Sequence, residues 1–326
     1  MDITPNNDAV TRSGFAAVVG APNAGKSTLT NQLVGEKVSI VTHKVQTTRF
    51  QIRAIAMLDT SDKAVSQVVL VDTPGIFAPR KQDRLAKSMV HAAWSGADDS
   101  NAIVHVVDAG AWYRHKIGEG DAQDRLGSED TERVMAGLAK RERKAALVLN
   151  KMDTVPKEEM LPLIAHFDEH GEYDRIFVIS ATKGEGVPEL ATYLADAMPE
   201  GPLLYPVDQA ADIPVRLMAA EITREKLFLR LHDELPYASM VETEKWSERK
   251  DGSVKIDQII YVRRGTQKAI VLGKGGAAIK DIGASARKEM QEWLGRKVHL
   301  FLFVKVRENW MDDRARYTES GLEFDV

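Results

Sequence analysis

Hydrophobic and polar positions alternate in long blocks from Phe15 to about Met198. Short apolar runs, typical of buried strands, are separated by polar or amphipathic stretches long enough for helices that cross between neighbouring strands. This alternation predicts a doubly wound, parallel-type α/β sheet with helices on both faces. The apolar runs are Phe15–Val19, Val68–Val71, Ile103–Val107, Ala146–Leu149 and Ile176–Ile179.

A different pattern begins after a proline-rich stretch, residues 199–214, which predicts a linker. Beyond it, the apolar spacing predicts the order α-β-β-α-α-β and therefore a smaller α+β domain. Its elements are a helix at 215–231, strands near 238–245 and 254–263, a short helix ending at Gly273, a helix at 277–293 and a strand at 298–306. The predicted domains are a flexible N-terminus 1–13, an α/β domain 14–200, a linker 201–214, an α+β domain 215–310 and a tail 311–326.

Composition narrows the class of protein. A chain of 326 residues fits two domains, and the formal charge of −4 argues against a surface coated all over by nucleic acid. With no cysteine, disulfides and thiolate metal sites are excluded, and a reducing compartment is expected. The first thirteen residues lack the apolar core of a signal peptide, and no run approaches the roughly 20 apolar residues of a membrane-spanning helix.

The first strand is followed by a phosphate-binding motif. Gly20–Ser27 (GAPNAGKS) fits G-x-x-x-x-G-K-[ST] between a strand and a helix, where backbone N–H groups can surround phosphates. Lys26 is expected to bridge the β- and γ-phosphates, and the Ser27 hydroxyl to ligate Mg²⁺. The expected nucleotide contacts here are Gly20, Ala21, Pro22, Asn23, Ala24, Gly25, Lys26, Ser27 and Thr28.

Three further motifs, each at the end of a strand, indicate which nucleotide is bound, because ligands of open α/β sheets lie outside the carboxyl ends of the strands. In Asp72–Gly75 (DTPG), the aspartate can hold Mg²⁺ and the Gly75 amide can sense the γ-phosphate. In NKMD (150–153), Asp153 offers two acceptors to the paired donors of guanine, which adenine lacks. The expected contacts are Asp72, Thr73, Pro74, Gly75, Asn150, Lys151, Asp153 and, in SAT, Ser180, Ala181 and Thr182. The motifs predict a GTPase.

The polar segment Val41–Arg49 predicts a GTP-sensing loop, because a threonine there can reach both Mg²⁺ and the γ-phosphate. Thr47 and Thr48 are candidates, with Thr48 preferred. The expected catalytic residues are Lys26, Thr48, Asp72 and Gly75, and the expected metal ligands are Ser27, Thr48 and Asp72.

Two positions suggest how turnover is controlled. Ile76 stands where a Ras-like enzyme carries the glutamine that orients the attacking water, which predicts slow intrinsic hydrolysis. For Asn23 two roles are open: its carbonyl could help hold K⁺ against the phosphates, or its side chain could brace the loop.

The C-terminal domain carries the signal for nucleic acid. From Asp251 to Trp310 there are 12 Lys/Arg and 6 Asp/Glu, a local charge of +6. Gly273–Gly276 forms a GxxG loop between two helices, where a nucleic-acid backbone can lie against bare peptide, and this predicts a type II K-homology (KH) domain. Val271 is expected to line the floor with the apolar contacts, and Trp293 to lie in the core. The expected RNA contacts are Ile270, Leu272, Gly273, Lys274, Gly275, Gly276, Ile279, Lys280 and Arg287.

Taken together, the chain resembles the Era family of bacterial ribosome-assembly GTPases along nearly its full length. Beyond the nucleotide motifs and KVQTTR (44–49), the resemblance rests on EITREKL (221–227), ELPY (234–237), GKGGAAIKDIG (273–283), ARKEMQ (286–291) and VKVRENW (304–310). It implies a monomer that binds GTP or GDP, the single-stranded 3′ end of 16S rRNA and the 30S subunit. It also implies a cytoplasmic protein with peripheral association at the inner membrane face.

Other functions stay open at this point. An RNA-binding GTPase could act in tRNA modification or in membrane-linked cell-cycle control. An RNA-binding module with a merely structural nucleotide is a non-enzymatic alternative. The roles of Trp310 and of the insert at Ala111–Gly127 are left unassigned.

Overall fold

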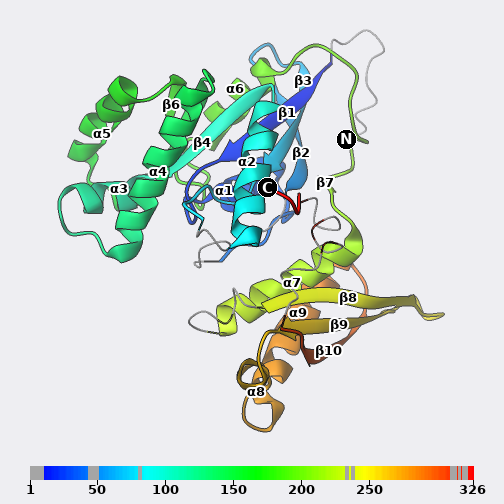
Figure 1. Cartoon of the computed structure of the whole chain (residues 1–326). Coiled ribbons are helices and arrows are strands. Elements are labelled where there is room, and N and C mark those ends of the chain that lie inside the picture. The colour runs from blue at the N-terminus through cyan, green and yellow to red at the C-terminus, as the bar shows by residue number, and fades with distance from the viewer. Residues whose placement is uncertain are drawn as a thin grey trace. The chain divides into compact units, whose positions relative to one another are not determined.

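The computed structural model describes residues 11–42, 51–79, 83–231, 235, 239–308, 314, 317 and 322–326 (Figure 1). Contacts divide these residues into two units, each described here by itself. The first contains the described residues up to Ser39, those from 51 to Asp212, and 317 and 322–326. The second contains residues 40–42, 213–231, 235, 239–308 and 314. The chain thus passes from one unit to the other between Asp212 and Ile213, inside the stretch expected as a linker.

The first unit is built on a seven-stranded sheet in the order β6-β5-β4-β1-β3-β2-β7. The five strands from β6 to β3 are parallel, whereas β2 and β7 pair antiparallel at one edge. The predicted α/β class is confirmed, with this antiparallel edge making the sheet mixed. The strands are β1 (Arg12–Val19), β2 (Ile52–Asp59), β3 (Val65–Asp72), β4 (Ala102–Asp108), β5 (Ala145–Asn150), β6 (Tyr173–Val178) and β7 (Ala211–Asp212).

Helices cover both faces of this sheet, which explains why its central strands are apolar on both sides. Leu29 of α1 and Leu190 of α6 share one buried cluster with Val18 and Val104. The opposite face holds α2, α4 and α5, with Val134 of α4 packed beside Ile103. The helices are α1 (Lys26–Val34), α2 (Arg84–Asp98), α3 (Ala109–Lys116), α4 (Ala122–Lys140), α5 (Lys157–His170) and α6 (Val187–Ala197).

The segment 111–127, left unassigned from the sequence, continues α3 and enters α4. Asp108 caps α3 by accepting a bond from the Ala111 amide, and Asp121 caps α4 within a reciprocal capping box. Arg114 Nε donates to Asp124 Oδ2 at 2.8 Å and ties the two helices together. The segment is therefore an ordered helical pair.

The second unit has the predicted α-β-β-α-α-β order. Its sheet runs β10-β9-β8, with β9 parallel to β10 and antiparallel to β8. Helices α7 and α9 pack on one sheet face, where Phe228, Ile260 and Val304 are buried together. The elements are α7 (Val215–Arg230), β8 (Ser239–Glu248), β9 (Val254–Val262), α8 (Gly265–Leu272), α9 (Ala277–Leu294) and β10 (Val298–Val306).

Two side-chain expectations in this unit are wrong. Val271 is fully buried among the core residues and lines no surface, because the helical period turns it inward while Ile270 points out. Trp293, expected in the core, is 36% exposed, because it lies near the end of α9 beyond the buried stripe formed by Ile282, Ala286 and Met290. Thr47, Thr48 and Trp310 lie outside the described residues.

Among the residues that the structure describes, no helix combines the length and the apolar character needed to cross a bilayer. In the same residues, no group of three or more His, Cys, Asp or Glu side chains forms a metal-binding cluster.

Candidate functional site

The loop from Gly20 to Ser27 joins β1 to α1 in a conformation that requires its glycines. Gly20 and Gly25 have φ values of +151° and +98°. A Cβ on Gly20 would lie 2.3 Å from the Val106 carbonyl oxygen, and one on Gly25 would lie 2.2 Å from Asn150 Nδ2. Side chains are excluded there because β4 and Asn150 approach the backbone closely. Asn23 also has positive φ, at +64°.

Lys26 lies inside this loop. Its ammonium donates to the Gly20 and Ala21 carbonyl oxygens at 3.1 and 2.9 Å, and the residue is only 6% exposed. Burial lowers the pKa of Lys26 to about 8, while the charges of Asp72 and Asp130 act in the opposite direction. A buried cation in a glycine-containing loop at the start of a helix suits a phosphate.

The residues at the end of β3 fit a magnesium ion. Ser27 Oγ donates to Asp72 Oδ2 at 2.8 Å, and Asp72 is fully buried. Within the described residues, Asp72 Oδ1 has no hydrogen-bond partner. Burial raises the pKa of Asp72, opposed by the bond from Ser27 and by Lys26. A hydroxyl and a carboxylate with a spare buried oxygen are the hard oxygen donors that Mg²⁺ takes beside a phosphate.

The residues after Asp72 are packed against the phosphate loop. Thr73 Oγ1 donates to the Val18 carbonyl at 2.7 Å, and the Ile76 amide donates to the Gly20 carbonyl at 3.0 Å. A Cβ on Gly75 would lie 2.9 Å from Pro22 Cγ. The Ile76 side chain is 3% exposed and sits in the core beneath α2 and α4. It therefore points away from the nucleotide site.

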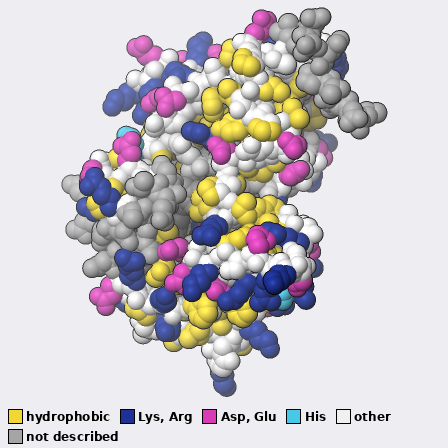
Figure 2. Space-filling model, turned by 90° about the vertical axis from the view of Figure 1, so that its right-hand side faces the viewer, with side chains coloured by type: hydrophobic (Ala, Val, Ile, Leu, Met, Phe, Trp, Pro, Cys, Tyr) yellow, Lys and Arg dark blue, Asp and Glu magenta, His cyan; other side chains and the backbone are white. Residues whose placement is uncertain are grey.

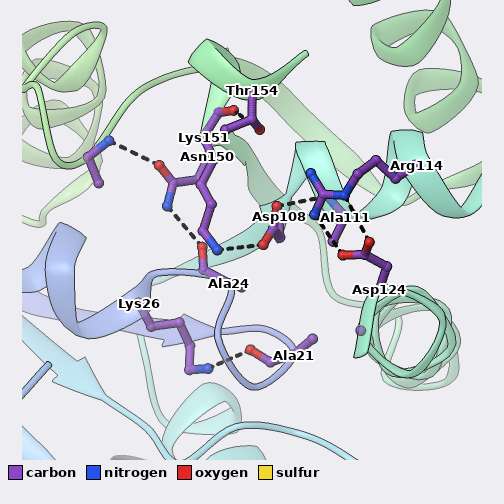
Figure 3. A network of polar contacts seen from close by, with 12 residues as sticks. Ala21, Ala24, Lys26, Asp108, Ala111, Arg114, Asp124, Asn150, Lys151 and Thr154 are labelled. Carbon is purple, nitrogen blue, oxygen red and sulfur yellow. Dashed lines mark hydrogen bonds and ion pairs between the residues drawn. The ribbon is translucent and has the colours of Figure 1, made fainter. Parts of the chain in front are cut away.

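Asn150 joins three of the predicted motifs (Figure 3). Its Nδ2 donates to the Ala24 carbonyl at 2.9 Å, and its Oδ1 accepts from the Ala181 amide at 3.0 Å. The side chain is 3% exposed and so braces both backbones from within. Ala181 is likewise buried, and the Ser180 and Thr182 hydroxyls lie 3.3 Å apart.

The next residues, Lys151 and Asp153, are both held by charged neighbours. Lys151 has φ of +62°, and its ammonium forms an ion pair with Asp108 at the end of β4 (Figure 3). Hydrogen bonding to Ser180 lowers the pKa of Asp153, and the Lys183 ammonium lies 3.3 Å from its carboxylate. Asp153 is therefore ionised at neutral pH and can accept two hydrogen bonds, as guanine recognition requires.

The structure thus brings the motifs at the ends of β1, β3 and β5 and after β6 to one edge of the sheet. Thr28 lies half-exposed in the first turn of α1. Sequence reasoning assigned no role to two acidic residues near this edge, Asp108 beside Lys151 and the largely buried Asp130 of α4, whose charge acts on Lys26. Position at a strand end could have indicated Asp108, but nothing local marks Asp130.

In the second unit the GxxG loop has the backbone form expected of a nucleic-acid contact. Gly273, Gly275 and Gly276 have φ values of +71°, +60° and +80°. A Cβ on Gly273 would lie 2.7 Å from Ala278 Cβ, whereas Gly275 and Gly276 have no atom within 4 Å of such a position. The first glycine closes the turn, and the next two leave open space where a phosphate backbone can approach.

The surroundings of the loop are basic and partly apolar. Lys274, Lys280 and Arg287 are exposed, as is Ile270 at 57%, while Leu272 and Ile279 are half-buried against the core. Figure 2 shows Lys and Arg side chains on one face of this unit, together with apolar side chains and some Asp and Glu side chains. Cationic side chains beside an apolar floor are what single-stranded RNA needs.

Comparisons with known proteins agree with both sites. A family model described as 50S ribosome-binding GTPase matches residues 15–151, and a KH-domain model matches residues 234–311. GTPase Era of Maricaulis maris is 57% identical over 320 residues, which cover 98% of this chain and 100% of that protein. GTPase Era of Agrobacterium fabrum is 54% identical over 319 residues, which cover 98% and 94%.

Two solved structures are similar over nearly the whole chain. One is a variant of Aquifex aeolicus Era bound to GDP and AlF4⁻, with a TM-score of 0.83. The other is Era with MgGDPNP and nucleotides 1506–1542 of 16S ribosomal RNA, with a TM-score of 0.84. Each is 34% identical, covering 95% of this chain and 99% of the other. With relatives of this identity matching nearly end to end, through both the nucleotide motifs and the GxxG module, the chain belongs to the Era family of GTPases.

Proposed function

We propose that this GTPase binds the single-stranded 3′ end of 16S rRNA and assists assembly of the 30S ribosomal subunit. The observation that carries the proposal is that one chain holds both a guanine-nucleotide site and an open, basic GxxG loop. A relative similar over 99% of its chain was solved with MgGDPNP and a 16S rRNA fragment bound together.

At the nucleotide site, Lys26 would exchange its two carbonyl partners for the β- and γ-phosphates. Ser27 and Asp72 would hold Mg²⁺, which offsets the charge that develops on the phosphate oxygens during hydrolysis. Asp153 would select guanine, and Asn150 would keep the phosphate loop and the Ala181 amide in register. Thr48 and Gly75 are proposed to sense the γ-phosphate.

At the RNA site, the backbone would lie against Gly275 and Gly276, with Lys274 supplying charge and Ile270 a surface for bases. GTP would favour the RNA-binding state and hydrolysis would reset it. This is a switch, and it requires the two sites to be coupled.

The test is binding of a short single-stranded RNA copy of the 16S rRNA 3′ end at fixed salt, with a GTP analogue and with GDP. Binding favoured by the GTP analogue supports the proposal. A scrambled RNA of equal length controls for charge alone, since non-specific binding follows the phosphate backbone. Turnover raised by 30S particles would support the assembly role over tRNA modification and over a structural nucleotide.

A matched pair of variants locates the RNA site. Lys274→Gln removes one positive charge at the GxxG loop, and Lys250→Gln removes one from the exposed β8–β9 turn of the same unit. The proposal expects weaker binding from the first variant only. Equal losses in both would place the RNA elsewhere.

Three further points belong to the same proposal. Asn23, with its left-handed backbone in the phosphate loop, is proposed to help hold K⁺, and equal turnover in K⁺ and Na⁺ would remove that idea. The family resemblance supports a monomer in the cytoplasm and peripheral contact with the inner membrane face. Light scattering of the purified protein and fractionation of cell extracts would test these two expectations.

A further inference from the structure

The motif EITREKL (221–227) takes part in neither site described above, yet three of its charged residues are almost fully buried. Glu221, Arg224 and Glu225 of α7 are 5%, 2% and 3% exposed. Glu221 and Arg224 form an ion pair one helical turn apart, which neutralises both within α7. Glu225 and its neighbour Lys226 make different contacts, which extend away from their own helix.

Glu225 holds a segment that is distant in sequence. Its Oε1 accepts a hydrogen bond from the Val41 backbone amide at 3.0 Å, across 184 positions of the chain. Residues 40–42 group with the second unit, although the chain enters them directly from the first. Ile40, the first residue of this segment, is 1% exposed, and its burial anchors the segment.

The residues just before this segment, Val38 and Ser39, are held by a helix of the nucleotide site. Asn31 of α1 accepts from the Val38 and Ser39 amides at 2.9 Å and donates to the Ser39 carbonyl at 2.8 Å. Asn31 lies four positions after Ser27, and so one turn along the helix that begins at the phosphate loop. Ser39, the last residue that Asn31 holds, is two positions before Val41, which Glu225 holds.

Through Lys226, Glu225 is also linked to α9, the helix that follows the GxxG loop. Lys226 Nζ donates to Glu225 Oε2 at 2.7 Å and forms a second ion pair with Glu289 of α9. Burial would lower the pKa of Lys226, but the two carboxylates outweigh it and raise the pKa, so the ammonium persists. Helix α9 begins at Ala277, directly after the GxxG loop.

We propose that Glu225, Lys226 and Glu289 are positioning residues that couple the nucleotide site to the RNA-binding loop. The connected elements are α1, the segment at Val38–Val41, α7 and α9, each joined to the next by hydrogen bonds or ion pairs. This relay deepens the proposed function and rests on it, because it carries the coupling which that function requires.

The measured quantity is the ratio of the RNA dissociation constant with GDP to that with the GTP analogue. Glu225→Gln keeps a carbonyl acceptor for Val41 but removes the charge that holds Lys226. Glu289→Gln removes the ion pair to α9 and leaves the Glu225–Lys226 pair intact. This variant therefore disturbs the fold less than Glu225→Gln does. Glu292→Gln is the matched control, because it removes the same charge from an exposed position three residues along α9.

The proposal expects both relay variants to reduce the ratio at least threefold while Glu292→Gln leaves it unchanged. By linkage, RNA must lose the same factor in its effect on nucleotide affinity. A merely structural role would lower the melting temperature and weaken RNA binding equally in both nucleotide states. An unchanged ratio in both relay variants would overturn the relay alone.

Measurements on the wild-type protein distinguish failure of this inference from failure of the proposed function. A wild-type ratio of one would overturn the relay and the switch together but keep RNA binding. No RNA binding in either nucleotide state would overturn the proposed function itself.

Discussion

Acid should destabilise the first unit through one buried ring, His105 of β4. The residue is completely buried, and its Nδ1 lies 2.8 Å from the Tyr173 hydroxyl. Its Nε2 has no hydrogen-bond partner among the described residues. Burial lowers the pKa of His105 from 6.5 to about 3, and the positive charge of Lys26 adds to the effect.

The direction of this pH effect on stability follows from the difference in proton binding between the folded and the unfolded protein. Below pH 6.5 the unfolded chain takes up a proton at His105, whereas the folded unit does so only near pH 3. The stability that the neutral ring contributes is complete above pH 6.5 and is lost as the pH falls toward 3. At about 1.36 kcal/mol per pH unit, acidification from pH 6.5 to 5 removes about 2 kcal/mol, and the whole interval removes about 5 kcal/mol. Since domains are stable by only about 5–15 kcal/mol, this one ring matters.

The assay is urea unfolding of the full chain at pH 7, 6 and 5, using the transition that GDP shifts to identify the first unit. The comparison protein carries His105→Phe together with Tyr173→Phe, because removing both polar partners leaves neither unsatisfied. Carboxylates that titrate in this range are common to both proteins. The wild type should therefore lose about 2 kcal/mol more than the double variant between pH 7 and pH 5. Parallel losses in the two proteins would refute the assignment of this acid sensitivity to His105.

Three shorter predictions concern the two sites. Asn150→Ala leaves the Ala24 carbonyl and the Ala181 amide without their partner, so it should remove about 3 kcal/mol, seen as a fall of roughly 10 °C in Tm. Asp153→Asn replaces one acceptor by a donor, so GTP affinity should fall ~100-fold or more while a xanthine nucleotide, which carries a carbonyl in place of the guanine amine, binds better; both are measured by nucleotide titration. Lys274→Gln should reduce the slope of log affinity for single-stranded RNA against log salt by about 0.7, and an unchanged slope would show that the ammonium makes no phosphate contact.

The architecture could be predicted from the sequence because its signals are local. The apolar runs that end at Val19, Val71 and Leu149 are each followed by a motif that can be recognised from its spacing alone. The α-β-β-α-α-β order was equally readable, since each element in it has its own periodicity. The two-residue strand β7 could not be predicted, because it is defined by its pairing with Arg53 and Ala54 and lies in a proline-rich stretch.

The contacts that join distant parts of the chain could not be predicted. Glu225 and Lys226 look like a solvated charge pair on a helix, and only the fold buries them against Val41 and Glu289. Trp293 has core-like spacing but lies beyond the buried stripe of its helix. Sequence spacing reports which face of a helix a residue occupies, and it does not report where that face stops being covered.

The buried position of Ile76 also bears on turnover. The Ile76 amide donates to the Gly20 carbonyl, and the side chain packs in the core with Ala17 and Ala93. Even a longer side chain at this position would therefore point into the core and away from the γ-phosphate. Ile76→Gln should therefore leave single-turnover GTP hydrolysis within about twofold of wild type. It should lower stability by about 1–3 kcal/mol, because an amide would be buried without partners. Ile76→Val, which stays apolar, is the control for packing. A tenfold gain in hydrolysis with glutamine would contradict this reasoning and would mean that the segment after Gly75 turns outward when GTP binds.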